Sequence, residues 1–254
     1  MPRFFVAENN IDLVSGVIVI DGDDAHHISR SLRMAVGDHL TVCDGKSFEY
    51  SCVLTCFGQN SVSCTIVETK ELTTEPPFSV VIYQALPKGD KLDTIIQKSI
   101  ECGAASLVTF ESEFCVAKEK EDSAVRKLER RRRIAAEAAK QCGRGIIPAV
   151  YPTMDFESAV KEAAKADIPL FCYEGEGTVT LKSLINQQKK TLDQNKITAP
   201  KISVIIGSEG GFSDREAEFA KENGMLMAGL GSRILRSETV AGFVLACLVY
   251  EFEL

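Results

Sequence analysis

Short runs of alternating apolar and polar residues fill the first 70 residues, a pattern typical of strands with one buried face. The runs are Gly16–Ile20, His39–Cys43, Phe48–Leu54 and Ser61–Val67. Turn-forming residues separate them at Gly37-Asp38, Asp44-Gly45 and Gly58-Gln59-Asn60. One helix is expected between about Asp24 and Met34. The pattern predicts a small β-barrel.

A polar stretch, Glu68–Pro77, interrupts this series and closes with two prolines. Proline lacks the N–H that a helix or a central strand needs, so neither element continues through it. We therefore expect a domain boundary here, with a first domain over residues 1–70 and a second over 76–254.

Beyond Phe78 the chain alternates between strand-like and helix-like segments. Strands are expected at Ser79–Ala85, Ser106–Phe110, Pro169–Tyr173, Lys201–Ile206 and Met225–Gly229. Helices are expected at Leu92–Cys102, Ala124–Gln141, Phe156–Ala166, Asp214–Glu222 and Glu238–Tyr250, and the polar stretch 182–200 carries no predicted element. Such alternation predicts an α/β fold whose parallel sheet is covered on both faces.

Composition supports a globular chain. The 254 residues are 45% hydrophobic and 26% charged, which excludes collagen-like and strongly disordered classes. No apolar run approaches the ~18 residues of a membrane span, and Glu8 interrupts the start before a signal-peptide core forms. We expect a cytoplasmic protein with no membrane partner.

The nine cysteines form no tight pairing pattern, so reduced thiols are expected. The closest candidates for a metal site are Cys43, Cys52, Cys56 and Cys64. They contain no CxxC pair and stand in strand-like segments, which favours buried small hydrophobic residues over zinc ligands. No metal is expected.

The net charge of −7 conceals one basic segment. Residues 118–144 hold ten Lys or Arg against five Asp or Glu, so they carry +5 and the remainder carries −12. In the predicted helix, Arg126, Arg130 and Arg133 share one face, while Ala135, Ala138, Ala139 and Cys142 continue an apolar seam. The cationic face is either simply solvated or a contact for a phosphate backbone.

Two loops that follow predicted strands are unusual. The first runs from Gly207 to Asp214 with three glycines around Glu209, and Ser213 or Asp214 is placed to cap the next helix. It is either a tight turn or a place where a ligand approaches the main chain, at the carboxyl edge where α/β sheets bind ligands. The second, Leu230–Thr239, contains two arginines and a glutamate. Neither fits a P-loop or a GxGxxG fingerprint, so ATP and NAD are not expected.

The last predicted helix is apolar on every face between Val240 and Tyr250. It is too short to span a bilayer, so it must be covered by protein. Either the monomer buries it entirely, or a second copy of the chain covers part of it.

Several motifs together resemble the knotted SPOUT methyltransferases and, more narrowly, the RsmE family of bacterial 16S ribosomal RNA uridine N3 methyltransferases. The strongest are Ile206-Gly207-Ser208-Glu209-Gly210-Gly211 and Leu230-Gly231-Ser232-Arg233-Ile234-Leu235-Arg236-Ser237-Glu238-Thr239. Others are Arg3-Phe4-Phe5, His26-His27, Leu32-Arg33, Gly37-Asp38, Lys88-Gly89-Asp90-Lys91, Gln97-Lys98, Glu101-Cys102-Gly103, Glu137-Ala138, Gln141-Cys142-Gly143-Arg144 and Pro148. The family more often carries proline at Ser208, leucine at Cys102 and threonine at Ser237.

The resemblance implies a PUA-like RNA-binding β-barrel followed by a SPOUT α/β domain with a deep trefoil knot, an exception to the rule against knots. It also implies a homodimer formed through the C-terminal domain, with S-adenosylmethionine held bent in the knot loops. The residues it assigns to cofactor binding are Leu170, Cys172, Glu174, Ile206, Gly207, Glu209, Gly211, Leu230, Gly231, Ile234 and Leu235.

Uridine N3 carries a weakly acidic proton that must leave before or during methyl transfer. All three histidines, 26, 27 and 39, lie in the first domain, so a carboxylate or solvent must accept this proton. As a hypothesis, Arg236 stabilises the uridine anion, and Glu238 either orients it, accepts the proton or only forms a structural ion pair. The expected contacts to 16S ribosomal RNA or the 30S subunit are Arg3, His27, Arg33, Lys88, Lys91, Arg130, Arg133, Gln141 and Arg144.

Two other functions remain open at this point. Related knotted enzymes methylate the ribose 2′-oxygen instead of a base. A ribosome assembly factor that binds RNA without catalysis would also fit the fold.

Overall fold

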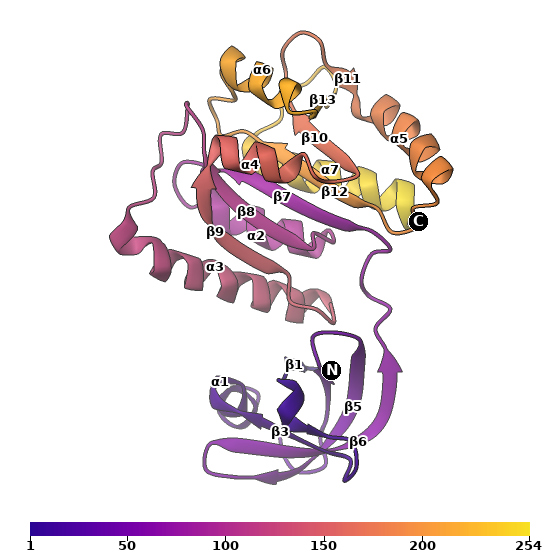
Figure 1. Ribbon diagram of the computed structural model, residues 1–254. Coiled ribbons are helices and arrows are strands. Elements are labelled where there is room, and N and C mark those ends of the chain that lie inside the picture. The colour runs from indigo at the N-terminus through magenta and orange to yellow at the C-terminus, as the bar shows by residue number, and fades with distance from the viewer. The chain divides into compact units, whose positions relative to one another are not determined.

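The computed structural model describes all 254 residues and divides into two compact units. Unit 1 comprises Met1–Glu75 together with Ala139–Ile147, and unit 2 comprises Pro76–Ala138 and Pro148–Leu254. Figure 1 shows the elements of both. No helix combines the length and the apolar character needed to cross a bilayer.

Unit 1 contains a six-stranded sheet in the order β1-β4-β5-β6-β3-β2. The strands are β1 (Arg3–Phe5), β2 (Ile11–Asp12), β3 (Val17–Asp21), β4 (His39–Cys43), β5 (Phe48–Phe57) and β6 (Ser61–Glu71). All neighbours are antiparallel except β1 and β4. The four predicted strands are confirmed, whereas β1 and β2 were missed because each is only two or three residues long. β6 also extends four residues into the predicted linker.

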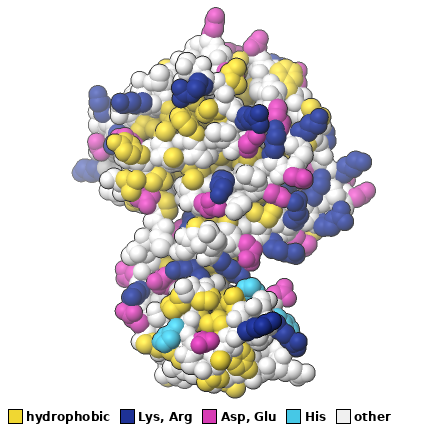
Figure 2. Space-filling view, turned by 180° about the vertical axis from the view of Figure 1, so that it is seen from behind, with side chains coloured by type: hydrophobic (Ala, Val, Ile, Leu, Met, Phe, Trp, Pro, Cys, Tyr) yellow, Lys and Arg dark blue, Asp and Glu magenta, His cyan; other side chains and the backbone are white.

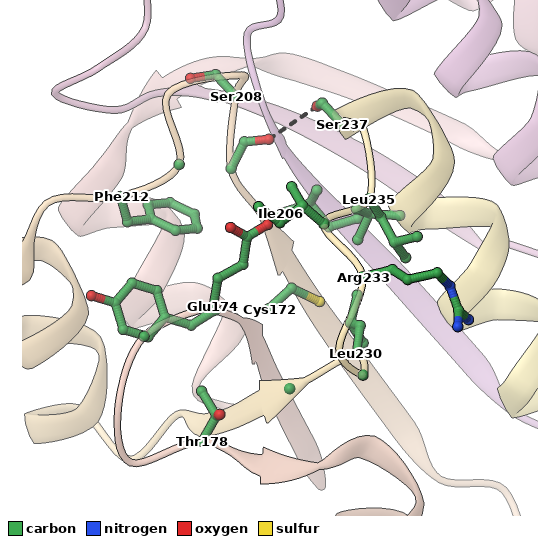
Figure 3. A pocket seen from close by; sticks show the side chains of 18 of the residues that line it. Cys172, Glu174, Thr178, Ile206, Ser208, Phe212, Leu230, Arg233, Leu235 and Ser237 are labelled. Carbon is green, nitrogen blue, oxygen red and sulfur yellow. Dashed lines mark hydrogen bonds between the residues drawn. The ribbon is translucent and has the colours of Figure 1, made fainter.

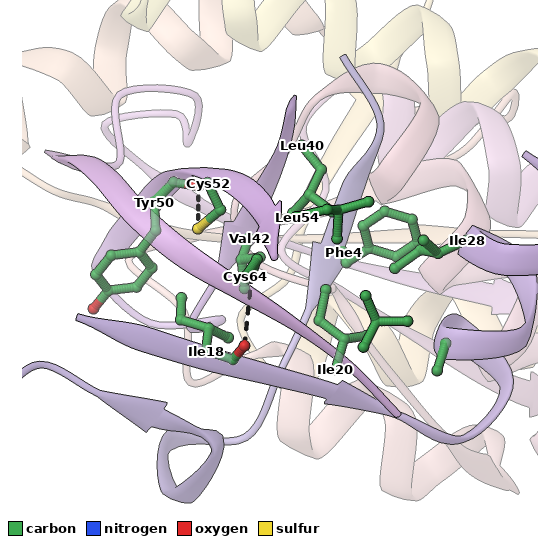
Figure 4. Close-up of a cluster of buried hydrophobic side chains, with 12 residues drawn as sticks. Phe4, Ile18, Ile20, Ile28, Leu40, Val42, Tyr50, Cys52, Leu54 and Cys64 are labelled. Carbon is green, nitrogen blue, oxygen red and sulfur yellow. Dashed lines mark hydrogen bonds between the residues drawn. The ribbon is translucent and has the colours of Figure 1, made fainter. Parts of the chain in front are cut away.

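One face of this sheet encloses the core of unit 1 (Figure 4). Alternate residues point inward, as Tyr50, Cys52 and Leu54 do from β5, because successive side chains in a strand face opposite sides. The predicted helix is present as α1 (Gly22–His26) followed by a π-helical turn, His27–Ser31, and it contributes Ala25 and Ile28. Of the four clustered cysteines, Cys43, Cys52 and Cys64 are buried as expected, while Cys56 is exposed.

Unit 2 is built on a seven-stranded, all-parallel sheet in the order β11-β13-β10-β12-β7-β8-β9. The strands are β7 (Ser79–Ala85), β8 (Ser106–Glu111), β9 (Ala149–Asp155), β10 (Ile168–Cys172), β11 (Val179–Thr180), β12 (Lys201–Ile206) and β13 (Leu226–Gly229). The helices are α2 (Lys91–Glu101), α3 (Glu121–Cys142), α4 (Phe156–Ala163), α5 (Leu181–Asn195), α6 (Asp214–Glu222) and α7 (Ser237–Phe252). The predicted parallel α/β sheet is confirmed.

Helices cover both faces of this sheet. α4 packs against β7, β8, β9 and β12, while α2 and α7 pack together, with α7 against β12 (Figure 1). The fully buried Ile82, Ile95 and Val204 lie in the resulting layers. Burying one such side chain stabilises the folded chain by about 1.5–3 kcal/mol relative to leaving it exposed. The sheet is therefore the stable part of unit 2, and it holds the loops in position.

Three elements of unit 2 were missed from the sequence, and the shortest is the two-residue strand β11. β9 contains Pro152 and buries only Val150, which the sheet accepts because β9 is an edge strand. The polar stretch 182–200, for which the sequence predicted no element, contains most of α5. That helix buries a narrow stripe, Leu181, Leu184, Ile185 and Leu192, and begins at Thr180, whose side chain accepts a hydrogen bond from Ser183 N.

The basic helix α3 exposes Arg126, Arg130 and Arg133 as predicted, and buries Ala135, Ala138 and Ala139, but Cys142 is exposed.

Arg131 is the one arginine of α3 that is buried. Its Nη2 atom lies 2.7 Å from Glu119 Oε1, and both side chains are only 7% exposed. Arg131 Nη1 also donates to the hydroxyls of Thr109 and Thr153. This buried pair joins α3 to the segment that follows β8.

Replacing Arg131 by Ala is expected to lower the free energy of unfolding by about 3–5 kcal/mol, because Glu119 is left buried without its counter-charge. The matched control is Arg130→Ala at the next position, where the exposed guanidinium pairs with Asp93 and the loss should be at most about 1 kcal/mol. Chemical denaturation measures both values. Equal losses would contradict the structural role of the buried pair.

Candidate functional site

Three loops at the carboxyl ends of β10, β12 and β13 surround a cavity of about 660 Å³ (Figure 3). These strands are neighbours or near neighbours in the sheet, in the order β13-β10-β12, so their ends meet at one edge. Parallel α/β sheets bind ligands at this edge. Both loops that the sequence singled out are present here, together with a third, residues 173–178, after β10.

The loop after β12 is fixed by local hydrogen bonds. Gly211 N donates to Ser208 O at 3.1 Å, and Gly211 adopts φ +67°, a conformation that favours glycine. Ser213 begins α6 with a capping box, accepting from Glu216 N while Glu216 Oε2 accepts from Ser213 N. A side chain at Gly207 would place its Cβ 3.2 Å from Gly211 Cα. The turn thus exposes main chain to the cavity.

Beneath the cavity, a buried amide joins three elements. Gln84, at the end of β7, is fully buried, and its Nε2 donates to Gly207 O at 3.2 Å and to Ser237 Oγ at 3.0 Å. Ser237 Oγ in turn donates to Gly207 O at 3.0 Å, the bond drawn in Figure 3. β7, the loop after β12 and the first residue of α7 are therefore held together by one polar cluster. The sequence prediction did not include Gln84, because a polar residue inside a strand gives no sign of its partners.

The cavity has an apolar wall and one acidic side chain. Ile206, Leu230 and Leu235 lie on one side and Phe212 on the other, with the Glu174 carboxylate extending between them (Figure 3). Phe212 is itself buried against Phe171, with ring centroids 4.3 Å apart. Arg233 lines the cavity as well. An apolar slot that carries a carboxylate and a guanidinium suits a flat heterocyclic ligand with charges of both signs.

Nine of the eleven residues predicted to bind cofactor line this cavity, namely Cys172, Glu174, Ile206, Gly207, Gly211, Leu230, Gly231, Ile234 and Leu235. The other two do not. Leu170 is fully buried in the middle of β10, and Glu209 points to a different set of partners. Tyr173, within the segment 170–174 that the resemblance assigns to the cofactor pocket, lines the cavity as well. Thr178 and Phe212 also line it, although the sequence assigned neither of them to the cofactor.

Glu209 belongs to an ion cluster at the start of α2. Its Oε1 lies 2.6 Å from Lys91 Nζ, and both of its oxygens accept from Lys88 N at 3.2 Å. Burial raises the pKa of Glu209, but the hydrogen bonds from Lys91 and Lys88 outweigh this and hold it below the usual range. The hydrogen bond to Glu209 raises the pKa of Lys91. Both groups are therefore charged near neutral pH.

The two predicted catalytic residues lie beside this cluster. Glu238 Oε2 is 3.6 Å from Lys91 Nζ, and Glu238 Oε1 is 3.9 Å from Arg236 Nη1. The Arg236 side chain is 85% exposed, so its guanidinium is accessible to a substrate. Neither residue lines the cavity, but Ser237 between them does.

The predicted RNA contacts divide between the two units. In unit 2, Lys88, Arg130 and Arg133 are exposed and Lys91 is partly exposed. In unit 1, His27, Arg33 and Gln141 are exposed. The remaining two are buried or partly buried against carboxylates: Arg3 Nη1 lies 2.8 Å from Glu49 Oε2, and Arg144 Nε donates to Glu75 Oε2 at 3.1 Å. Lys91 and Arg130 also pair with carboxylates, those of Glu209 and Asp93. A phosphate bound by any of these four would compete with a carboxylate.

No group of three or more His, Cys, Asp or Glu side chains is arranged to hold a metal ion. Burial raises the pKa of the Cys172 thiol, inside the cavity, to about 12. This thiol is protonated at neutral pH and is a poor nucleophile.

Comparison with known proteins assigns the class. Residues 74–249 match the model of an RNA methyltransferase domain, and residues 20–67 match an RNA methyltransferase PUA domain. The unit that carries the cavity is thus an RNA methyltransferase domain, and unit 1 is PUA-like.

Whole-chain relatives narrow this to one family. The ribosomal RNA small subunit methyltransferase E of Bacillus subtilis is 33% identical over 255 residues, covering 100% of this chain and 98% of its own. The enzyme of that name from Neisseria gonorrhoeae, solved bound to S-adenosyl methionine, gives a TM-score of 0.83 at 25% identity, over 99% of this chain and 98% of its own. A putative methyltransferase from Legionella pneumophila, solved in complex with SAM, gives 0.83 at 26% identity, over 98% and 97%. The chain belongs to the ribosomal RNA small subunit methyltransferase E family.

The state of Cys172 can be tested by alkylation. At pH 8 a thiol with a pKa of about 12 holds roughly 1000-fold less thiolate than an unperturbed cysteine. Iodoacetamide should therefore modify the exposed Cys56 and Cys142 long before Cys172, as followed by peptide mass spectrometry. Labelling of Cys172 as fast as Cys56 would contradict the raised pKa.

Proposed function

We propose that this protein transfers the methyl group of S-adenosylmethionine to N3 of a uridine in the 16S ribosomal RNA of the small ribosomal subunit. The observation that carries the proposal is the cavity formed by three loops, in a chain of this family whose relatives bind S-adenosylmethionine. The proposed place of action is the cytoplasm, where the RNA substrate is present.

The residues of the cavity fit the cofactor. Leu230, Leu235 and Ile206 offer an apolar surface for an adenine ring, and the main chain of Gly231, which also lines the cavity, would offer hydrogen bonds to its edge. Gly231 adopts φ +105°, so a side chain there would strain the loop. The Glu174 carboxylate supplies negative charge for the positively charged part of the molecule. When bound, S-adenosylmethionine supplies an electrophilic methyl group on a sulfonium centre.

The chain's own residues must then manage one proton. Uridine N3 becomes a nucleophile only as its proton leaves, and the ring becomes anionic. Arg236, exposed and next to the cavity, is placed to stabilise that anion. Glu238, between Arg236 and Lys91, either orients the guanidinium or accepts the proton. Burial raises the pKa of Cys172, the cysteine that lines the cavity, which disfavours the thiolate that methylation at uracil C5 requires.

The remaining assignments concern RNA binding and architecture. We assign residues 1–70 to a PUA-like RNA-binding domain and 76–254 to the methyltransferase domain. Lys88, Lys91, Arg130 and Arg133 would contact phosphates from the second domain. Arg3, His27, Arg33, Gln141 and Arg144 would do so from unit 1. The deep trefoil knot of the loops stays a prediction.

Labelled methyl transfer tests the reaction. Small ribosomal subunits from a strain lacking this protein are incubated with the purified chain and labelled S-adenosylmethionine, and the nucleosides are identified by mass spectrometry. The expected product is N3-methyluridine. An alkali-resistant dinucleotide would indicate ribose 2′-O methylation instead, and tight RNA binding without cofactor binding would indicate an assembly factor.

Replacing Arg236 by Ala is expected to lower turnover about 100- to 1000-fold, because one donor to a developing anion is lost. Cofactor affinity should change little, since Arg236 does not line the cavity. Turnover is measured at saturating substrate and affinity by calorimetry. The control is Arg215→Ala, an exposed arginine of α6 away from this cavity. Unchanged turnover would discard the role of Arg236.

We also propose a homodimer formed through α7. Phe243, Ala246 and Tyr250 are exposed on one face of this helix, and hydrophobic side chains gather on the corresponding side of unit 2 in the view from behind (Figure 2). Ala241, Val244, Leu245 and Leu248 face the interior instead. The helix therefore has a buried side and an apolar exposed side, and a second copy of the chain would cover the latter.

Phe243→Glu should convert this dimer to a monomer, because a carboxylate would be buried at the interface without a partner. Light scattering after gel filtration should show the mass fall from twice 27.7 kDa to the chain mass. The control is Val125→Glu on α3, an apolar residue that is also exposed. A wild-type protein that is already monomeric would contradict the proposed dimer.

A further inference from the structure

The segment that follows β8, residues 112–119, is an irregular loop held at both ends. Near its start, Glu113 N donates to Glu216 Oε1 at 2.8 Å, and Ser213 Oγ donates to Glu113 Oε2 at 2.7 Å. At its end, Glu119 N donates to Glu111 Oε1 at 2.7 Å, and the Glu119 carboxylate forms the buried pair with Arg131. These bonds fix the loop against α6 and α3.

Between these anchors the loop presents apolar side chains to solvent. Phe114 is 46% exposed and Val116 is 76% exposed, while Cys115 turns inward. Ordering a loop costs conformational entropy, and exposing apolar surface on it recovers none of that cost. A fixed loop with an exposed aromatic side chain is typical of a surface prepared for a ligand.

Phe114 also contacts the rim of the cofactor cavity. A Cβ added to Gly210, which lines the cavity, would lie 2.7 Å from Phe114 Cβ and 3.3 Å from Phe114 O. Glu209, the residue before Gly210, is bound by Lys88 N and Lys91 Nζ. Two consecutive residues of the loop after β12 therefore contact different neighbours. Glu209 contacts the lysines at the start of α2, and Gly210 contacts Phe114.

The aromatic side chains that line this cavity are already engaged. Phe212 is buried against Phe171, and the Tyr173 hydroxyl donates to Asp214 Oδ1 at 3.2 Å while its ring packs on Phe171. Phe114 differs from both, since nearly half of its side chain is open to solvent.

We propose that Phe114 is the stacking platform for an unpaired nucleobase of the RNA substrate at the mouth of the cofactor cavity. The proposal rests on the proposed function and adds the residue that receives the base. N3 lies on the pairing edge of uridine, so the reaction requires a base that is out of its helix. Such a base loses its neighbours, and aromatic side chains replace them by stacking. Lys88 and Lys91, which bind Glu209 next to Gly210, would contact the adjoining phosphates.

Steady-state kinetics with small ribosomal subunits as substrate tests the proposal. Phe114→Ala and Phe114→Leu should raise KM for RNA about 5- to 150-fold, the range for loss of one stacked base. Turnover at saturating RNA should stay within about threefold, because Phe114 contacts no group that handles the proton. Phe114→Trp should restore the wild-type KM, since it retains a stacking face. Val116→Ala, in the same loop, is the matched control and should leave KM unchanged.

Two further measurements separate stacking from a structural role. Calorimetry with S-adenosylmethionine alone should give the same affinity for the wild type and Phe114→Ala. Light scattering should give the same mass for both.

An unchanged KM in Phe114→Ala overturns the proposal. So does a loss of cofactor affinity, which would reduce Phe114 to a support for the Gly210 turn, or a loss of dimer, which would make it an interface residue. If the wild type transfers no methyl group, the proposed function fails. The stacking proposal is then decided by fluorescence anisotropy with labelled 16S RNA, where Phe114→Ala must bind about 5- to 150-fold more weakly than the wild type.

Discussion

The geometry of the cavity depends on one buried amide. Gln84 reaches from the end of β7 to the carbonyl of Gly207 and the hydroxyl of Ser237, so three separate chain segments take their positions from one side chain. Its Oε1 atom is buried without a hydrogen-bond partner. Leaving such an atom unsatisfied costs about 1–3 kcal/mol, which the two bonds from Nε2 to these loops must offset. Gln84 is a polar residue in a hydrophobic sheet because the loops above it require a donor there.

Periodicity alone predicted most of the fold, and the failures have physical causes. β7, β12 and α6 begin and end at the predicted residues because each combines a clear apolar pattern with a turn or a cap at its ends. α5 was missed because four buried residues among fifteen suffice when a helix covers only the outer part of a sheet. β9 was missed because an edge strand tolerates proline and exposed residues. Strand order was not predictable, since it depends on contacts between distant segments.

The site was predicted unevenly. The glycine-containing loops could be predicted from the sequence, because main chain that must approach a ligand requires glycine at positions such as Gly207 and Gly231. The direction in which individual side chains point could not be predicted. Glu209 stands among those glycines, yet it turns to Lys91, and Arg144 resembles a surface cation, yet it is buried against Glu75. Phe114 lies in a loop without any motif, and only the packing against Gly210 relates it to the cavity.

α7 contributes both to the cavity and to an exposed apolar surface. Its first turn supplies Ser237 and Val240 to the cavity, and its later turns carry the exposed Phe243 and Tyr250. A helix of 16 residues is a stiff rod about 24 Å long, so a displacement at one end is transmitted to the other. Any packing against its outer side that displaces the helix would therefore also displace Ser237 and Val240 at the cavity. Where such packing changes the affinity for the ligand, thermodynamic reciprocity requires that ligand uptake change the strength of the packing by the same factor.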